Sequence, residues 1–303
     1  MVAMSLLQPD PATRALIDKV APHLPTTGRI GVAYSGGVDS AALLAVCHYL
    51  LGHERTLGIT AISASFAARE RAMARDTAAL IGAEVIEVET HEDEIEAYQE
   101  NTTDRCYFCK NEMFEVIDQS VVDKHNLEAV AYGENADDAK RIDRPGARAA
   151  TEHGVLRPLA AAGLTKADVR EIARGFGLPV ADKPAAPCLA SRVPHGLEVN
   201  REKLAQIEGL ELTLYELGFS DSRVRHHEKI ARIELLPEEM ARAADPAVAM
   251  RIVESARELG FTYATVDLKG IQSGAMTLEA MKSLKDQLKD KLKYVGADEE
   301  RRD

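Results

Sequence analysis

The sequence lacks a long apolar segment. No run of about 18 apolar residues occurs in the 303-residue chain, so we expect no membrane-spanning helix. Residues 1–24 also lack a basic start followed by an apolar core, so we expect no secretory signal. Four cysteines in a chain of this length do not make a disulfide scaffold. We therefore expect a cytoplasmic protein, in which clustered cysteines suggest metal or redox chemistry.

The sequence also lacks an excess of basic residues. Its 37 lysines and arginines stand against 49 aspartates and glutamates, which gives a formal net charge of −12. No overall positive field would attract a phosphate backbone, so a nucleic-acid partner is not expected, although a local basic groove stays open. The hydrophobic fraction of 46% is ordinary for a globular protein, and the length is sufficient for two domains.

Apolar runs alternate with helical patterns in the first half of the chain. Strands are expected at residues 29–34, 57–63, 84–88 and 127–132. Helices are expected at about residues 10–24, 41–52, 67–82, 91–99 and 110–124. This alternation predicts an α/β fold with a doubly wound parallel sheet, in which ligands bind beyond the carboxyl ends of the strands. Ser35–Ser40, Ser63 and Asn135–Asp138 all follow strand ends, which predicts one shared site.

The second half of the chain changes pattern. Residues 139–154 are rich in Arg, Gly and Ala and are expected to form a loop or lid, and Thr165 is expected to cap a helix with Asp168 at the capping-box position. After residue 196 we expect a helix, two strands, a helix and a strand, at about residues 199–217, 222–226, 230–236, 246–259 and 263–268. This order predicts a smaller α+β domain. The predicted domains are 1–197, 198–280 and a charged helical tail at 281–303.

A glycine-rich turn follows the first expected strand. Residues 34–40 read Tyr-Ser-Gly-Gly-Val-Asp-Ser, and an apolar helix follows them. Gly36 and Gly37 permit positive φ and let backbone N–H groups approach a ligand, while the helix N-terminus favours an anion. Ser35 and Ser40 supply hydroxyl donors, so the expected guest is a phosphate chain. The turn is not a Walker loop, because no lysine follows the glycines. A purely structural strand–helix turn is the alternative.

Three of the four cysteines lie in polar surroundings. Cys106 and Cys109 form a Cys-x-x-Cys pair, which suits a redox dithiol, half of a metal site, or two thiols simply packed at a helix start. The helix start and flanking cations such as Arg105 would favour thiolates. Cys188 lies in a loop beside serine and arginine, where a cysteine rarely serves as core filler. Cys47 lies in an apolar helix and is expected to pack in the core.

Two arginines share one face of an expected strand. Arg223 and Arg225 are two residues apart, and the period of a strand places both side chains on the same side. Paired guanidinium groups suit bidentate contacts with a phosphate or a carboxylate. A solvated edge strand is the alternative interpretation.

Several motifs occur in one order along the chain. They are Ser-Gly-Gly-Val-Asp-Ser at 35–40, Asp-Arg-Cys-Tyr-Phe-Cys-Lys at 104–110, Gly-x-Asn-Ala-Asp-Asp at 133–138, Arg-Pro-Gly at 144–146 and Lys-Pro-x3-Cys-Leu-Ala-Ser-Arg at 183–192. The first resembles the pyrophosphate loop of the ATP pyrophosphatases. The combination, over about residues 15–280, resembles the LarE family, ATP-dependent sulfur transferases that build the nickel-pincer nucleotide cofactor of lactate racemase. The resemblance implies an adenine nucleotide α-hydrolase-like fold for the first domain.

The resemblance also implies a reaction and its site residues. ATP would adenylate one carboxylate of pyridinium-3,5-biscarboxylic acid mononucleotide, and a sulfur donor would then displace AMP to leave a thiocarboxylate. Mg²⁺, helped by Asp39, would neutralise the leaving pyrophosphate. Contacts to ATP are expected from Ser35, Gly36, Gly37, Val38, Asp39, Ser40, Ser63, Lys110, Asn135 and Asp138. Contacts to the substrate are expected from Lys183, Ser191, Arg192, Glu211, Arg223 and Arg225.

The family resemblance implies two sulfur sources. In some members one cysteine, equivalent to Cys188, gives up its own sulfur and becomes dehydroalanine. Others carry three cysteines and hold a 4Fe–4S cluster, and this sequence has the trio Cys106, Cys109 and Cys188. Three thiolates leave one iron without a protein ligand, which could hold an extra sulfide. We expect the cluster, with sacrifice of Cys188 as the alternative.

Other functions stay open at this stage. A tRNA thiolase of the same superfamily would need a basic groove and usually has extra Cys-x-x-Cys pairs, whereas this chain has one such pair and a charge of −12. A non-catalytic nucleotide-binding module would leave the cysteine trio unexplained. The family resemblance further implies a homo-oligomer, a hexamer built from trimers, and a functional link to the maturation proteins of lactate racemase.

Overall fold

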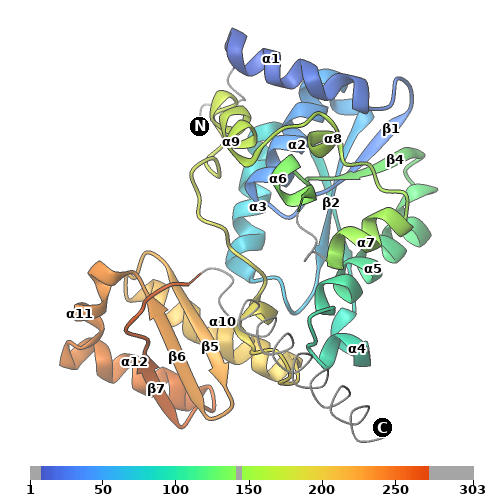
Figure 1. The fold of residues 1–303 in the computed structure, drawn as a ribbon. Coiled ribbons are helices and arrows are strands. Elements are labelled where there is room, and N and C mark those ends of the chain that lie inside the picture. The colour runs from blue at the N-terminus through green and yellow to red at the C-terminus, as the bar shows by residue number, and fades with distance from the viewer. Residues whose placement is uncertain (1–7, 141–144, 273–303) are drawn as a thin grey trace, which may run out of the picture. The chain divides into compact units, whose positions relative to one another are not determined.

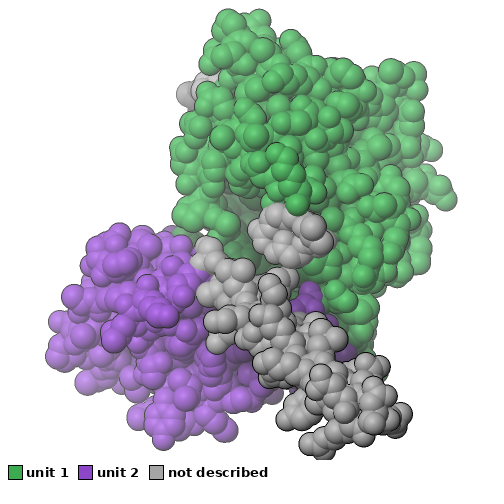
Figure 2. All heavy atoms as spheres, in the orientation of Figure 1, with its two compact units in different colours: residues 1–98, 104–188 green, residues 99–103, 189–303 purple. Residues whose placement is uncertain are grey.

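The computed structural model describes residues 8–140 and 145–272 of the chain. These residues fall into two compact units, one drawn from 1–98 and 104–188 and the other from 99–103 and 189–303 (Figure 2). Each unit is built around its own sheet. Within the part of the chain that is described, no helix is both long and apolar enough to cross a membrane.

The first unit is built on a parallel four-stranded sheet. Its strands are β1 (Arg29–Ala33), β2 (Thr56–Ile62), β3 (Glu84–Glu89) and β4 (Leu127–Tyr132). They lie in the order β3-β2-β1-β4, and every neighbouring pair is parallel. β1 is interior, and its last four residues are buried. A parallel sheet is covered on both faces, which explains why the interior strands β1 and β2 read as mostly continuous apolar runs, whereas the edge strand β3 contains glutamates among its apolar residues.

Helices cover both faces of this sheet (Figure 1). On one face, α1 (Pro11–Val20), α2 (Val38–Leu51), α3 (Ala68–Ile81) and α9 (Lys166–Gly175) share an apolar core. On the other face, α5 (Arg105–Ile117) and α7 (Pro145–Glu152) share a second core with β2 and β4. Three short helices complete the unit, namely α4 (Glu96–Gln99), α6 (Ala136–Ala139) and α8 (Pro158–Ala161). The predicted doubly wound α/β fold is confirmed.

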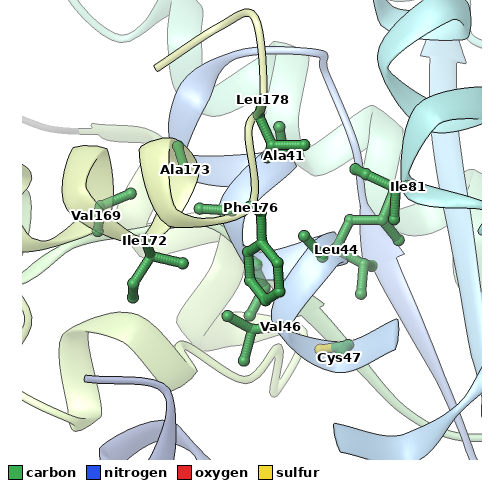
Figure 3. Packing of buried hydrophobic residues seen from close by; sticks show 14 of the residues in the cluster. Ala41, Leu44, Val46, Cys47, Ile81, Val169, Ile172, Ala173, Phe176 and Leu178 are labelled. Atoms are coloured by element: carbon green, nitrogen blue, oxygen red, sulfur yellow. The ribbon is translucent and has the colours of Figure 1, made fainter. Parts of the chain in front are cut away.

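The first core surrounds α2, the helix that follows the glycine-rich turn (Figure 3). Residues Ala41–Cys47 of this helix are fully buried, so α2 is apolar on all sides. Phe176 and Leu178 pack in the same cluster. Burial raises the pKa of the Cys47 thiol to about 12, so this cysteine is a neutral core residue, as the sequence predicts.

The second unit contains a three-stranded mixed sheet. Its elements are α10 (Arg201–Glu216), β5 (Ser222–His227), β6 (Ile230–Leu235), α11 (Met240–Ala243), α12 (Pro246–Glu258) and β7 (Tyr263–Val266). The order is β5-β6-β7, with β5 antiparallel and β7 parallel to β6. α10 and α12 each bury an apolar stripe, including Leu210, Leu214 and Ile252. The five expected elements are confirmed, with α11 added between β6 and α12, and the predicted tail lies outside the described residues.

A short segment from the first half of the chain belongs to this second unit. Asn101, with a φ of +53°, is fully buried there. Its Nδ2 donates to the carbonyl oxygens of Val193 at 3.3 Å, Pro194 at 2.8 Å and Leu197 at 2.9 Å. Its own carbonyl oxygen accepts the backbone N–H of Gly196 at 3.2 Å. These bonds attach residues 99–103 to the start of the C-terminal unit.

Two local predictions are wrong. The expected helix over 91–99 is a single turn at Glu92–Glu94 followed by the short α4, because the Glu92 carboxylate is buried and hydrogen-bonded rather than exposed on a helix face. The expected loop over 139–154 contains α7, whose Ala149 and Ala150 are fully buried. Alanine has the highest helix propensity, so an alanine-rich segment with an apolar stripe forms a helix once a core receives it.

Candidate functional site

The turn between β1 and α2 has the backbone that an anion-binding loop needs. Gly36 has a φ of +73°, and a Cβ there would lie 2.5 Å from the Cβ of Ala74, so only glycine fits. Gly37 has a φ of −72° and simply precedes the helix, so the expectation of positive φ holds for only one of the two glycines. The N-terminus of α2, 14 residues long, follows directly and favours a negatively charged ligand.

The two serines of this loop have different environments. Ser40 is buried, and its Oγ accepts the backbone N–H of Ser35 at 3.2 Å and donates to the carbonyl oxygen of Gly37 at 3.0 Å. Ser35 is exposed, and its Oγ lies 3.2 Å from the Oγ of Ser40. Ser40 therefore maintains the shape of the turn, and Ser35 is the hydroxyl that faces solvent.

The residues after β4 pack directly on this loop. A Cβ on Gly133 would lie 2.6 Å from the carbonyl carbon of Asp39, so this approach also requires glycine. Asn135 donates from Nδ2 to Asp39 Oδ1 at 3.0 Å and to Asp138 Oδ2 at 2.8 Å. Its Oδ1 accepts the backbone N–H groups of Asp137 and Asp138, which caps α6. The structure thus brings together three predicted nucleotide contacts, Asp39, Asn135 and Asp138.

The structure adds Lys166 to this group, a residue that sequence reasoning missed. Its Nζ donates to Asp39 Oδ2, and its backbone N–H donates to Asp137 Oδ2 at 2.9 Å. Lys166 is the first residue of α9, which Thr165 caps with the predicted capping box to Asp168. A lysine at a helix N-terminus opposes the helix dipole. A lysine directly after the predicted Thr165 cap was therefore the signal in the sequence that could have pointed to a functional role for Lys166.

Ser63 lies at the end of β2 in a second polar chain. Its Oγ is 3.0 Å from the Oγ of Ser65, which donates to the Glu92 carboxylate at 3.0 Å. Thr90 donates to the other Glu92 oxygen at 2.9 Å. Glu92 is only 2% exposed, and its Oε1 is 4.0 Å from the Sγ of Cys109. Sequence analysis missed this buried carboxylate, which links the end of the sheet to the Cys-x-x-Cys helix.

The thiols of the Cys-x-x-Cys pair are held neutral. Burial raises the pKa of Cys109 well above its ordinary value, and the negative charge of Glu92 raises it further. Loss of water around the thiol also raises the pKa of Cys106, while Arg105 acts in the opposite direction. The expectation that the helix start and its cations favour thiolates is therefore wrong for this state of the protein, because desolvation outweighs them.

All three predicted sulfur residues lie in the first unit. Cys188 interacts electrostatically with both Cys106 and Cys109. The buried Arg105 guanidinium belongs to the same neighbourhood, because burial lowers its pKa but Cys188 and Cys106 more than offset that effect. Over residues 8–140 and 145–272, however, no group of three or more His, Cys, Asp or Glu side chains is arranged to hold a metal ion.

Two other predicted contacts of the first unit have protein partners. Lys110 places its Nζ 3.8 Å from the centre of the Tyr132 ring, a cation–π contact. Lys183 donates to the Glu70 carboxylate at 2.6 Å and lies 3.6 Å from the sulfur of Met73. Both predicted ligand contacts are thus engaged with protein groups in this structure.

The second unit holds a buried pair of opposite charges. Arg225 contacts the Glu234 carboxylate at 2.7 Å, and their side chains are 5% and 1% exposed. Arg225 also donates to the carbonyl oxygen of Ser191 at 3.0 Å. Arg223 is 3% exposed, and both arginines contact the carbonyl oxygen of Gln272, so they share one face of β5 as predicted. The alternative of a solvated edge strand is wrong.

A second ion pair lies beside the first. Arg192 donates from Nε and Nη2 to the two oxygens of Glu211, at 2.9 and 3.3 Å. Glu211 also accepts the backbone N–H of Val224 at 2.9 Å. Burial lowers the pKa of Arg223, and the nearby charges of Arg192 and Arg225 lower it further. Arg192 and Arg225 each pair with a carboxylate, and Arg232 also contacts Glu234 at 3.5 Å. Asp221 and Glu234 act on Arg223 in the opposite direction, but its pKa is still lowered overall.

Comparisons with known proteins identify the family. The asparagine synthase family matches residues 12–118. A Lactiplantibacillus plantarum protein named pyridinium-3,5-bisthiocarboxylic acid mononucleotide synthase is 34% identical over 82% of this chain and 88% of its own length. An uncharacterized protein of Synechocystis sp. is 39% identical over 81% of this chain and 90% of its own length, and one of Methanocaldococcus jannaschii is 31% identical over 68% and 77%.

The first of these matches covers both the phosphate loop and the Cys-x-x-Cys helix. The named synthase aligns with most of this chain at an identity that indicates common ancestry. On this similarity, and with the loop geometry described above, the chain belongs to the LarE family of ATP-dependent sulfur transferases within the pyrophosphate-loop superfamily.

Proposed function

We propose that this chain adenylates a carboxylate of pyridinium-3,5-biscarboxylic acid mononucleotide with ATP and then replaces an oxygen of that carboxylate with sulfur. The observation that carries the proposal is that one compact unit contains both a glycine-dependent phosphate loop and three mutually interacting thiols. The printed name of the Lactiplantibacillus relative supports the same substrate class.

The first step is assigned to the phosphate loop. A carboxylate oxygen of the substrate attacks the α-phosphorus of ATP, the bond to the β-phosphate oxygen breaks, and pyrophosphate leaves. The Gly36 turn, the exposed Ser35 hydroxyl and the N-terminus of α2 would hold the departing phosphates. Asp39 is the proposed ligand of Mg²⁺, because it offers a partly exposed carboxylate next to this loop.

The second step is assigned to the thiols. A sulfur nucleophile attacks the activated carbonyl carbon, and AMP leaves with the former carboxylate oxygen. The donor set of Cys106, Cys109 and Cys188 fits a 4Fe–4S cluster in number and type, and such a cluster would supply sulfur while sparing Cys188. The Tyr98 hydroxyl supports a further group at this place, because it is buried, interacts electrostatically with Cys188 and Cys109, and has no hydrogen-bond partner within the described residues.

The alternative sulfur source is Cys188 alone. Its thiolate would attack the acyl adenylate and form a thioester as AMP leaves. Loss of the Cα proton and cleavage of the Cβ–S bond would then leave the thiocarboxylate on the product and dehydroalanine in the chain. Cys188 is exposed, which this route requires.

The arginines of the second unit are the proposed anchor for the anionic substrate. Arg223 is the proposed substrate contact, because burial, Arg192 and Arg225 disfavour its charge and Asp221 and Glu234 offset this only in part. A phosphate or carboxylate from the substrate would relieve that repulsion. Glu211 and Ser191 would act by holding Arg192 and Arg225 in position.

The test uses anaerobically purified protein with ATP, Mg²⁺ and candidate acceptors. Pyrophosphate release that depends on the dicarboxylate nucleotide supports the proposal, and release that depends only on tRNA overturns it in favour of a tRNA thiolase. No release with any acceptor would instead favour a nucleotide-binding module.

The sulfur source has its own measurement. Absorbance near about 400 nm that disappears in Cys106→Ala supports the cluster. A colourless protein that completes one turnover, with Cys188 lighter by the mass of one H₂S afterwards, would establish the sacrificial route.

We also propose that the protein is cytoplasmic and is linked to lactate racemase maturation. The proposed homo-oligomer is a hexamer, and light scattering would test it by measuring the molar mass in solution.

A further inference from the structure

Lys166 and Asp39 are connected through a rigid frame. The capping box at Thr165 and Asp168 fixes the start of α9, and the backbone N–H of Lys166 donates to Asp137 at 2.9 Å. The Lys166 side chain contacts Asp39 Oδ2, while Asn135 holds Asp39 Oδ1 at 3.0 Å. The two oxygens of Asp39 therefore have different partners, one a fixed amide and the other a flexible ammonium group.

The ammonium group is the more easily displaced of the two partners. The Lys166 side chain is 39% exposed and that of Asp39 is 19% exposed, so solvent reaches the ammonium end of this ion pair and weakens it. Asn135 is 1% exposed and makes four hydrogen bonds, so it stays in place. Asp137 and Asp138 add two negative charges nearby, so the group as a whole attracts a second cation.

We propose that Lys166 is an exchangeable counter-ion of Asp39. Without nucleotide it occupies the carboxylate oxygen that Mg²⁺ would use, and so disfavours binding of the free metal. When a nucleotide with Mg²⁺ binds, Asp39 would become a ligand of the metal, and the Lys166 ammonium would move to an oxygen of the departing pyrophosphate. No proton is transferred, because the lysine keeps its charge throughout. This inference rests on the proposed splitting of ATP at this loop.

The exchange predicts opposite effects on two ligands. In Lys166→Met, inorganic pyrophosphate in the presence of Mg²⁺ should bind about tenfold to a hundredfold more weakly, because one charge-assisted hydrogen bond is lost. Mn²⁺ added without nucleotide should bind more tightly, because nothing competes for Asp39. AMP, which lacks the leaving phosphates, should bind as it does to the wild type. Lys166→Arg should restore pyrophosphate binding in part.

The experiment measures pyrophosphate and AMP by calorimetry and Mn²⁺ by electron paramagnetic resonance, in the full-length chain. Lys124→Met is the control, since Lys124 is an exposed lysine away from the loop. Unchanged pyrophosphate affinity in Lys166→Met, or weaker rather than tighter Mn²⁺ binding, would overturn the exchange. These probes need no acceptor substrate, so the proposed sulfur transfer can fail while the role of Lys166 stands.

Discussion

Gly133 lies against the backbone of Asp39. A Cβ on Gly133 would be 2.6 Å from the carbonyl carbon and 2.8 Å from the carbonyl oxygen of Asp39. The first residue after β4 therefore sets the position of the loop after β1 by direct backbone contact. These are backbone atoms, which cannot move aside as the end of a flexible side chain can. A side chain at position 133 would therefore displace the loop or the end of β4.

Gly133→Ala should weaken nucleotide binding and also lower the free energy of unfolding by about 1–3 kcal/mol, because overpacking displaces the start of α2. Calorimetry with ATP and urea unfolding measure the two effects. Gly154→Ala is a matched control, since Gly154 has a φ of +63° but no atom within 4 Å of an added Cβ. The control should cost stability but leave ATP affinity unchanged, and equal ATP affinity in both variants would contradict the prediction.

Glu92→Gln should make Cys109 more reactive. The negative charge of Glu92 adds to burial in raising the pKa of this thiol, so its removal should lower that pKa and increase the thiolate fraction near neutral pH. Iodoacetamide labelling at several pH values, followed by peptide mapping, measures the change at Cys109. Cys47 is the internal control, because it is fully buried and should stay unlabelled in both proteins. Unaltered labelling of Cys109 would refute this electrostatic account.

Arg225 and Arg223 of β5 should contribute differently to stability and to substrate binding. Glu234→Ala leaves the buried Arg225 without its counter-ion and should cost about 3–5 kcal/mol of stability. Arg223→Ala removes a guanidinium whose charge is disfavoured by burial, so it should cost much less stability while raising KM for the anionic substrate. Denaturant unfolding and steady-state kinetics distinguish them. Similar stability losses with no change in KM would argue against Arg223 as an anchor.

His226 should make the second unit sensitive to acid. It is 2% exposed, and burial together with Lys203 lowers its pKa below the ordinary 6.5. The native state therefore holds it neutral, while the unfolded chain binds a proton as pH falls below about 6.5. Stability is then complete above that pH and decreases as the pH falls toward the folded-state value.

The urea midpoint measured between about pH 8 and pH 5 should decrease less in His226→Gln than in the wild type. Glutamine keeps a donor for Gln206, which lies 2.8 Å from His226 Nε2. His23→Gln, at an exposed position, is the control and should leave the pH profile unchanged. Identical profiles for wild type and His226→Gln would mean that other groups cause the acid sensitivity.

Local signals were sufficient for much of the fold. Strand periodicity, the Gly36 turn and the Thr165 capping box each depend on neighbours within a few residues, and all three appear in the structure. The helix predicted over residues 91–99 is wrong because a contact distant in the sequence decides the local structure, since Glu92 accepts a hydrogen bond from Ser65, 27 positions away.

The site was less predictable because its contacts are long-range. Lys166 and Asp39 are 127 positions apart in the sequence, and the packing of α9 against α2 in one core brings them together. The charge state of the thiols could not be predicted either, because it depends on how deeply each thiol is buried, and the sequence pattern around the cysteines does not show this. Arg223 and Arg225 were found because a strand fixes which residues share a face.

Asn101 has a consequence for how this protein can be divided by recombination. A genetic exchange at the junction of Cys188 and Leu189 would transfer the C-terminal unit without residues 99–103. The recipient would then have to supply an asparagine with a left-handed backbone to bond Val193, Pro194 and Leu197. A chimera joined at this point should therefore keep its C-terminal unit intact only if the recipient has an asparagine at the position of Asn101.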